Sequence, residues 1–204
     1  MSELSEFLQH LANGLVLGFL YALVGIGLSM VYGILRMINF AHGEILMVGV
    51  FLALPVSALG APAIVVLLAG VAGATIMGLI VQWTIYRPLL RSPEVTLLVA
   101  SLGVSLLLQN LVLMMTSPQP KRPDPAPFLD QPFRLGEIVL RNVDLAIIVI
   151  AIAAMLVTHL FLKQTRHGRA LRALAQDMSA ARMMGVQVPF LVMICFVIGS
   201  ALPP

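Results

Sequence analysis

From Leu11 to Glu44 the chain reads LANGLVLGFLYALVGIGLSMVYGILRMINFAHGE. The first part, Leu11–Leu35, carries no charged residue, and a helix needs only about 20 consecutive apolar residues to cross a bilayer. The second part, Arg36–Glu44, brings a cation, an amide, an imidazole and a carboxyl together between apolar runs. This stretch therefore predicts a membrane-spanning helix that ends in a polar break.

The composition of the whole chain agrees with a membrane protein. Of 204 residues, 60% are hydrophobic and only 10% are charged, and the mean hydropathy is +1.02. Soluble domains carry about 25% charged residues. We therefore expect an all-α, polytopic integral membrane helical bundle that forms a single domain over residues 1–204. The formal charge of +3 is concentrated in loops, so it gives no indication of nucleic-acid binding.

Further apolar runs predict the remaining helices. Pro55, Gly60 and Pro62 divide the long uncharged run after the break into a shorter helix and a full span. The predicted helices after the break are 45–58, 63–86, 95–116, 145–162 and 186–202. The segments between them are a short loop at 87–94, a long proline-rich segment at 117–144 and a basic segment at 163–185.

The distribution of charge predicts the orientation of the chain. The segment Lys163–Gly185 has five basic residues against one acid, Asp177, and basic loops remain in the cytoplasm. The preceding span then places Ser117–Asp144, whose charges cancel, outside the cell. The span before that segment then places Arg87 and Arg91 in the cytoplasm, which agrees with their positive charge. The orientation of the N-terminus stays open, because the break at residues 36–44 need not cross the bilayer.

Small residues recur every four positions in two of the predicted spans. Such stripes allow helix backbones to approach closely in a membrane. We expect them to pack within the bundle, and a dimerisation face is the alternative. The stripes are Gly14/Gly18/Ala22, Gly25/Ser29/Gly33 and Gly70/Ala74/Gly78.

The polar break is the first candidate functional site. Ionisable groups at bilayer depth are costly, so they face a cavity or one another. One interpretation is an ordinary interfacial loop. The other is an unwound segment that lines a translocation path or clamps neighbouring helices, with Gly43 supplying backbone freedom. An amide pair in a later span either lines the path or makes interhelical hydrogen bonds. The candidates are Arg36, Asn39, His42, Gly43, Glu44, Gln109 and Asn110.

The basic segment is the second candidate site. Leu171, Leu174, Met178, Ala181 and Gly185 are spaced by three or four, so they share one face of a predicted helix, whereas Arg169 and Arg172 lie off it. Such a helix can lie on the membrane or dock into a groove of another protein.

The sequence contains no pattern typical of catalysis or of a cofactor site. It has no phosphate-binding loop, no nucleophile elbow and no Cys/His cluster. His42 and Glu44 lack a nearby third ligand, so we expect no metal and no cofactor. Cys195 is the only cysteine, which excludes an intramolecular disulfide, and Glu3 and Glu6 argue against a signal peptide.

Several motifs resemble one known family. The run Gly14–Phe51, with INFAHGE at Ile38–Glu44 as its most specific part, is similar to the start of permease subunits of branched-chain amino acid ATP-binding-cassette importers. Shorter similar motifs are Tyr86-Arg87-Pro88, Leu108-Gln109-Asn110, Gly168-Arg169-Ala170 and Phe196–Gly199. The resemblance follows nearly the whole chain in order, and INFAHGE places it closer to the first of the two paired permeases.

This resemblance implies a transport subunit rather than an enzyme. The implied partners are a second permease subunit, two cytoplasmic ATPase subunits, a periplasmic substrate-binding protein and membrane lipid, in a bacterial inner membrane. The implied cargo is branched-chain amino acids or related amides or urea. The segment Ser179–Gly185 (SAARMMG) matches the spacing of the family's coupling helix, with Ser179 in its acidic position. The residues expected to couple to the ATPase are Arg169, Leu171, Arg172, Leu174, Met178, Ala180, Ala181 and Gly185.

The chain departs from the family in length. Family members have further spans, whereas this sequence ends at Pro203-Pro204, which would interrupt a helix. The expectation is therefore a permease truncated at its C-terminus. Two alternatives stay open: a stand-alone secondary carrier or channel, and an inactive truncated remnant.

Overall fold

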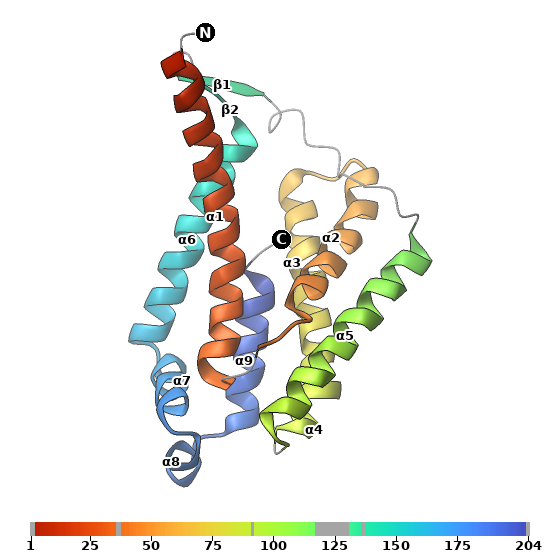
Figure 1. Cartoon of the computed structure of the whole chain (residues 1–204), viewed down its shortest axis with the longest axis vertical. Coiled ribbons are helices and arrows are strands. Elements are labelled where there is room, and N and C mark those ends of the chain that lie inside the picture. The colour runs from red at the N-terminus through yellow and green to blue at the C-terminus, as the bar shows by residue number, and fades with distance from the viewer. Residues whose placement is uncertain (1–2, 36–37, 91, 117–130, 136–137, 203–204) are drawn as a thin grey trace.

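The computed structural model describes residues 3–35, 38–90, 92–116, 131–135 and 138–202, and it is a bundle of helices (Figure 1). This confirms the predicted all-α class. The helical elements are α1 (Glu3–Leu35), α2 (His42–Ala58), α3 (Ala63–Val81), the π-helical turn η1 (Gln82–Tyr86), α4 (Arg87–Leu89), α5 (Glu94–Met115), α6 (Asn142–Gln164), α7 (Arg166–Gln176), α8 (Met178–Met183) and α9 (Val188–Ala201).

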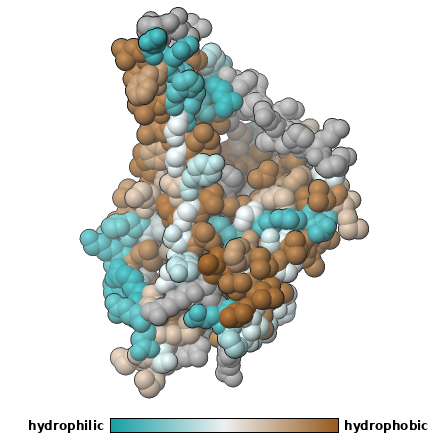
Figure 2. All heavy atoms as spheres, viewed as in Figure 1, coloured by the Kyte–Doolittle hydropathy of each residue, from teal (hydrophilic) through white to brown (hydrophobic). Residues whose placement is uncertain are grey.

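The long helices have the length and apolar character of membrane spans. Four described segments qualify by these criteria: Glu3–Gly33, Ala63–Leu89, Glu94–Met115 and Asn142–Gln164. The shorter apolar helices α2 and α9 lie among them. Large apolar side chains cover much of the surface, and hydrophilic residues gather at the N-terminal end, low on one flank and in a patch at mid-height on the other flank (Figure 2). With four such segments, the chain is a multi-pass membrane protein.

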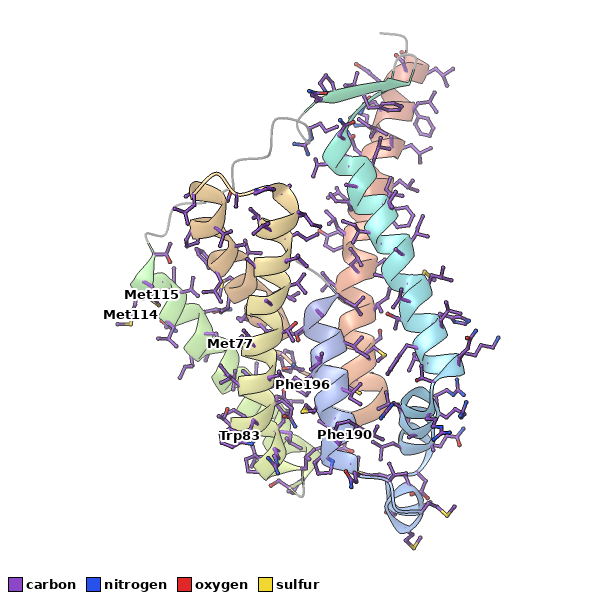
Figure 3. The ribbon with its side chains drawn as sticks, turned by 180° about the vertical axis from the view of Figure 1, so that it is seen from behind. Met77, Trp83, Met114, Met115, Phe190 and Phe196 are labelled. Atoms are coloured by element: carbon purple, nitrogen blue, oxygen red, sulfur yellow. The ribbon has the colours of Figure 1, made fainter. Side chains whose placement is uncertain are left out.

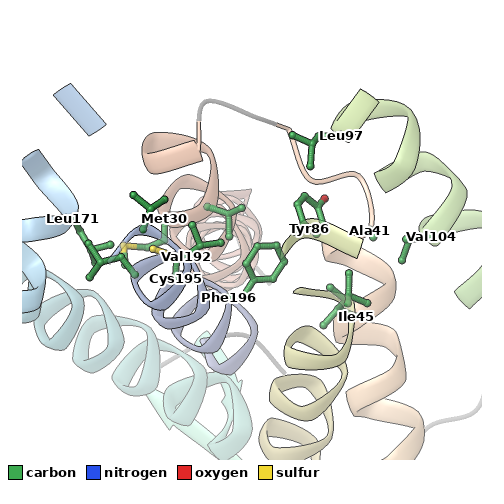
Figure 4. Close-up of a cluster of buried hydrophobic side chains, with 14 of the residues drawn as sticks. Met30, Ala41, Ile45, Tyr86, Leu97, Val104, Leu171, Val192, Cys195 and Phe196 are labelled. Atoms are coloured by element: carbon green, nitrogen blue, oxygen red, sulfur yellow. The ribbon is translucent and has the colours of Figure 1, made fainter. Parts of the chain in front are cut away.

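Helix α9 joins two groups of helices. On one side it contacts α1, which packs on α6, and on the other side it contacts α3, which packs on α2. Helix α5 contacts α2 and belongs to the same group as α2 and α3 (Figure 1). The buried core runs through the junction and includes Val192, Cys195 and Phe196 of α9 (Figure 4).

Glycines set the closest approaches at this junction. A Cβ on Gly27 of α1 would lie 2.6 Å from the carbonyl oxygen of Gly199 on α9, so only glycine fits there. The third predicted stripe behaves as expected. Gly70 and Ala74 of α3 meet Gly49 of α2, and a Cβ on Gly78 would lie 2.7 Å from Oγ of Ser200. These contacts confirm close packing within the bundle for this stripe.

The two stripes on α1 correct the expectation that they pack inside the bundle. Their residues are exposed, and a Cβ on any of their four glycines would meet nothing within 4 Å. Val16, Leu23 and Gly27 lie on the opposite, buried side of α1. The spacing of small residues identified the stripes, but it could not show which side of α1 the other helices would cover.

A short hairpin that the sequence did not predict ties two distant segments together. Strands β1 (Pro132–Leu135) and β2 (Ile138–Arg141) pair in antiparallel fashion. The amide of Gln9 on α1 donates to the carbonyl of Val139 (2.9 Å) and accepts from its N–H (2.8 Å). The N-terminal end of α1 therefore lies at the same end of the bundle as the segment that precedes α6.

The Gly27–Gly199 approach can be tested by adding one methyl group. Gly27→Ala should lower the melting temperature, because overpacking costs about 1–3 kcal/mol. The matched control is Gly25→Ala on the same helix, where the new methyl meets nothing. Cys195 is buried and is the only cysteine, so a fluorogenic thiol dye reports unfolding directly. Equal melting of the two variants would contradict the close contact.

The position of the N-terminus leads to a second prediction. In a Cys195→Ser background, cysteines replacing Leu4 and Gln131 should label from the outside with an impermeant reagent. A cysteine replacing Ser179 should label from the inside only. All three positions are exposed. The expected result follows from the basic segment at 163–185 and from the Gln9–Val139 contact. Labelling of Leu4→Cys from the same side as Ser179→Cys would rule out this topology.

Candidate functional site

The break between α1 and α2 is organised around the side chain of Asn39. This residue is only 2% exposed. Its Oδ1 accepts a hydrogen bond from the N–H of Ala41 (3.1 Å) and another from the hydroxyl of Tyr86 (2.7 Å). Asn favours such local bonds to the backbone two residues ahead. The break is thus held in one conformation and attached to η1.

Tyr86 reaches Asn39 from a π-helical turn at the end of α3. The N–H of Arg87 donates to the carbonyl of Gln82, five residues back, and Pro88 has no N–H to continue the α-helical pattern. The Tyr86 ring packs against Phe196 of α9, with ring centroids 4.8 Å apart (Figure 4). Tyr86 therefore links the break to both α3 and α9.

Helix α5 supplies a third support for the break. The N–H of Phe40 donates to Oγ of Ser101 over 3.4 Å, and Ser101 itself donates to the carbonyl of Leu98 (2.7 Å). Ser101 is fully buried. The sequence analysis did not select Tyr86 or Ser101 as site residues. Neither lies near the break in sequence, and a lone Ser in an apolar helix carries no distinctive signal.

His42 and Glu44 point in different directions, so they do not form one cluster. Both lie at the start of α2, where two residues of separation mean about 200° of rotation. The Nε2 of buried His42 lies 3.1 Å from the position that a Cβ on Gly27 would take, at the crossing of α1 and α9. Glu44 instead accepts through Oε1 from Nε2 of Gln109 on α5 (2.6 Å). The interhelical hydrogen bond that was one of the two expectations for the α5 amide pair is thus present for Gln109.

Other candidates in this group behave differently. Asn110 bonds to the carbonyl of Leu106 on its own helix (2.7 Å), so it bridges no helices here. Gly43 lies inside α2, and in the described chain only Gly60 and Gly185 have positive φ among glycines. The expectation that Gly43 supplies unusual backbone freedom is therefore wrong. Arg36 lies outside the described residues.

Three polar atoms of the break are shielded and make no hydrogen bond within the described part of the chain. They are Nδ2 of Asn39, Nε2 of His42 and Oε2 of Glu44. Most buried polar side-chain atoms in proteins have a partner, so three exceptions within six residues require an explanation. Among the described residues there is no group of three or more His, Cys, Asp or Glu that could hold a metal ion.

The basic segment forms two helices rather than the one predicted. Asp177 has extended backbone angles and separates α7 from α8. Its Oδ1 accepts from the N–H groups of Ser179 (2.8 Å) and Ala180 (3.0 Å), so it caps the start of α8. The chain leaves α8 through Gly185, which has a φ of +81°. Helix α8 is therefore bounded by non-helical residues on each side.

The apolar face of this segment is already covered by the chain itself. Leu171, Leu174 and Ala181 are buried and belong to the core. Met178 and Ala180 are half-buried, whereas Met183, Met184 and Gly185 are exposed. The expectation that the Leu171/Leu174/Ala181 face is free to dock on a partner is wrong, because periodicity cannot distinguish an internal from an external partner.

The two arginines of α7 also have internal partners. Arg172 donates to the carbonyl of Leu162 (2.7 Å) and Arg169 to that of Gln164 (3.3 Å), at the end of α6. A Cβ on Gly168 would collide with the carbonyls of Phe161 and Leu162. Gly168 and the arginines therefore fold α7 back onto α6, because arginine side chains satisfy carbonyls that a helix end leaves unpaired.

Comparison with known proteins decides the family. A family model described as "Branched-chain amino acid transport system / permease component" matches residues 10–203. The chain belongs to this family. The match includes the break, η1, the basic segment and α9, so both candidate sites lie within the part of the chain that the family model covers.

Individual members of the permease family show similarity along nearly the whole chain. A high-affinity branched-chain amino acid transport system permease protein, BraD of Pseudomonas aeruginosa, is 33% identical over 99% of this chain and 70% of the relative. LivH proteins with the same description are 35% identical in Salmonella typhimurium and 34% identical in Escherichia coli K12, over 96% of this chain and 68% of each relative. No solved structure matches the chain.

Proposed function

We propose that this permease is a transmembrane subunit of an ATP-driven importer in a bacterial inner membrane. It moves branched-chain amino acids, or related amides or urea, that a periplasmic binding protein delivers. It works with a second permease subunit and two cytoplasmic ATPase subunits, and the hydrolysis of ATP takes place on those partners. The family and its relatives support this proposal, and the form of α8 is the observation that carries it.

Helix α8 has the properties of a coupling element. It lies at one extreme end of the molecule, beyond α7 (Figure 1). Met183 and Met184 are 83% and 85% exposed, although the other large apolar residues of the basic segment, Leu171, Leu174 and Met178, are buried or half-buried. Large exposed apolar side chains are typical of a surface that another protein covers. We therefore assign the ATPase contact to the tip of α8 and not to the Leu171/Leu174 face.

Helix α7, from which α8 extends, is held in place by several contacts. Arg169, Arg172 and Gly168 hold α7 against α6, and Leu171 and Leu174 anchor it in the core. Asp177 alone separates α8 from α7, and residues 184–187 separate it from α9. A displacement of α8 would therefore pass to α7 across one residue, and from α7 to α9 through the contact between these two helices, as a coupled rigid-body transition requires.

The Glu44–Gln109 pair supports a translocation path along α2 and α5. Gln109 is exposed, and it lies well inside the apolar span of α5. A carboxyl group at such a depth costs about 2.5–3.5 kcal/mol against lipid on insertion scales. This face therefore meets a polar path or the second permease subunit. The shielded Oε2 of Glu44 is available to a polar group of the substrate or of that subunit.

The coupling role of α8 predicts the effect of changing Met183, its last residue, together with the adjoining Met184. The double variant Met183→Asp/Met184→Asp should reduce co-purification of the ATPase by on the order of tenfold or more, since buried interface anchors contribute about 2 kcal/mol or more. Substrate-stimulated ATP hydrolysis should fall with it. The matched control is Met114→Asp/Met115→Asp, an equally exposed pair at the C-terminal end of α5, on a flank away from α8 (Figure 3). Unchanged ATPase binding by the α8 variant would show that this tip is not the contact.

The path proposal predicts a loss of uptake on changing Glu44. In the assembled transporter, Glu44→Gln should lower the uptake rate about tenfold or more, because hydrogen bonds to a charged group contribute about 1.5–3 kcal/mol. The amount of inserted protein and the binding of the ATPase should not change. Glu94→Gln, an exposed carboxyl at the start of α5, is the control. If both variants import substrate at the normal rate, the Glu44–Gln109 pair serves only to hold α2 against α5.

A further inference from the structure

A groove of about 880 Å³ lies where the α3 span ends, beside the start of α9. Its walls come from η1 and α4 on one side and from residues 186–193 on the other. The charge distribution places this end of the bundle in the cytoplasm. Neither the path along α2 and α5 nor the tip of α8 uses this groove.

Gln82 gives the groove an unpaired polar group. The residue is only 3% exposed and lines the groove. Its side chain makes no hydrogen bond in the described part of the chain, and its polar atoms are not among the shielded ones, so they are open to the groove. An amide has two donors and an acceptor. A ligand with oxygen acceptors would satisfy the donors that the protein leaves unpaired.

Arg87 adds a positive charge to the groove. It is exposed and has neither an ion pair nor a side-chain hydrogen bond among the described residues. Arg169 and Arg172 differ, because carbonyl oxygens of α6 already occupy their guanidinium groups. The planar guanidinium of arginine suits phosphate oxygens, which it can bind in pairs.

The apolar part of the groove lies at the depth of the membrane boundary. Trp83 of η1 is 64% exposed and Phe190 of α9 is 42% exposed, and both line the groove. The Phe190 ring also lies near that of His167 on α7, with ring centroids 5.6 Å apart. Trp83 belongs to the membrane-spanning segment Ala63–Leu89. Tryptophan is enriched at this level of a membrane, where its ring lies among headgroups. The groove thus joins an apolar wall within the bilayer to a cation at its surface.

We propose that this groove binds the headgroup of an anionic phospholipid from the cytoplasmic leaflet. Arg87 pairs with the phosphate, Gln82 and Gln187 donate to its oxygens or to those of the glycerol, and Trp83 and Phe190 contact the first acyl carbons. Basic pockets between spans on the cytoplasmic side bind such lipids. A lipid fits better than a segment of the ATPase, because Trp83 lies inside the span. The inference depends on the proposed orientation but not on the coupling role of α8.

Trp83 is the only tryptophan of the chain, so its fluorescence reports the groove directly. The purified chain in detergent micelles is titrated with brominated phosphatidylglycerol or with brominated phosphatidylcholine of identical acyl chains. Bromine quenches tryptophan only at close range. Phosphatidylglycerol should reach half-maximal quenching at about fivefold lower mole fraction, the effect expected for one basic residue near an anionic membrane surface. Equal quenching by the two lipids would overturn the proposal.

Three variants distinguish binding of the lipid in the groove from a general attraction of anionic lipid to the basic surface. Arg87→Gln should abolish the preference for phosphatidylglycerol, and Gln82→Leu should reduce it. Arg166→Gln, an exposed arginine at the same end but outside the groove, should leave it unchanged. If Arg87→Gln and Arg166→Gln lose the preference equally, the attraction is not specific to the groove and the proposal is wrong.

A further measurement tests the competing occupant. Addition of the ATPase subunit should leave the quenching of Trp83 by phosphatidylglycerol unchanged. Protection of Trp83 from both lipids would assign the groove to the partner protein instead. Because the titration is done on the permease alone, its result is independent of whether the α8 variants keep or lose the ATPase.

Discussion

The requirement that polar backbone groups be satisfied away from water governs this structure. A chain inside a bilayer can leave the helical conformation only where protein groups replace the lost hydrogen bonds. Here the chain does so between α1 and α2, and the carboxamide oxygen of Asn39 accepts from both Ala41 and Tyr86. Ser101 receives the N–H of Phe40. The positions of α2, η1 and α5 around the break all depend on these few bonds.

The same bonds connect the break to the proposed coupling element. Helix α9 begins shortly after α8, and its Phe196 packs against the ring of Tyr86, whose hydroxyl bonds to Asn39. Gly199, one turn further along α9, lies against Gly27, next to His42. A displacement of α8 would therefore act on the break through α7, which contacts both α8 and α9, and then through α9. The shielded atoms of Asn39, His42 and Glu44 that have no hydrogen bond within the described residues would gain partners from a rearrangement there.

Hydropathy predicted the spans well because length and absence of charge are properties of the local sequence. The end of α2 at Ala58 and the start of α3 at Ala63 agree with the prediction, as does the continuation to Tyr86. The break was identified from its polar residues, but their partners were not, since Tyr86 and Ser101 are distant in sequence. Periodicity found the apolar face of α7 and the small-residue stripes of α1, yet could not show that Leu171 is covered and Gly18 is not. The division of the basic segment into α7 and α8 at Asp177 was not predicted. The apolar residues keep helical spacing on both sides of Asp177, so the sequence does not distinguish a residue that caps a new helix from one inside a continuous helix.

The central claim is that the Asn39–Tyr86 hydrogen bond holds the break, and a double-mutant cycle tests it most directly. The free energy of unfolding in detergent would be measured for the parent chain, Asn39→Ala, Tyr86→Phe and the double variant. Residues in one buried hydrogen-bond network show interaction energies of about 0.5–3 kcal/mol, so the double variant should be less destabilised than the sum of the single variants by an amount in that range. Strict additivity, with an interaction energy near zero, would contradict the account.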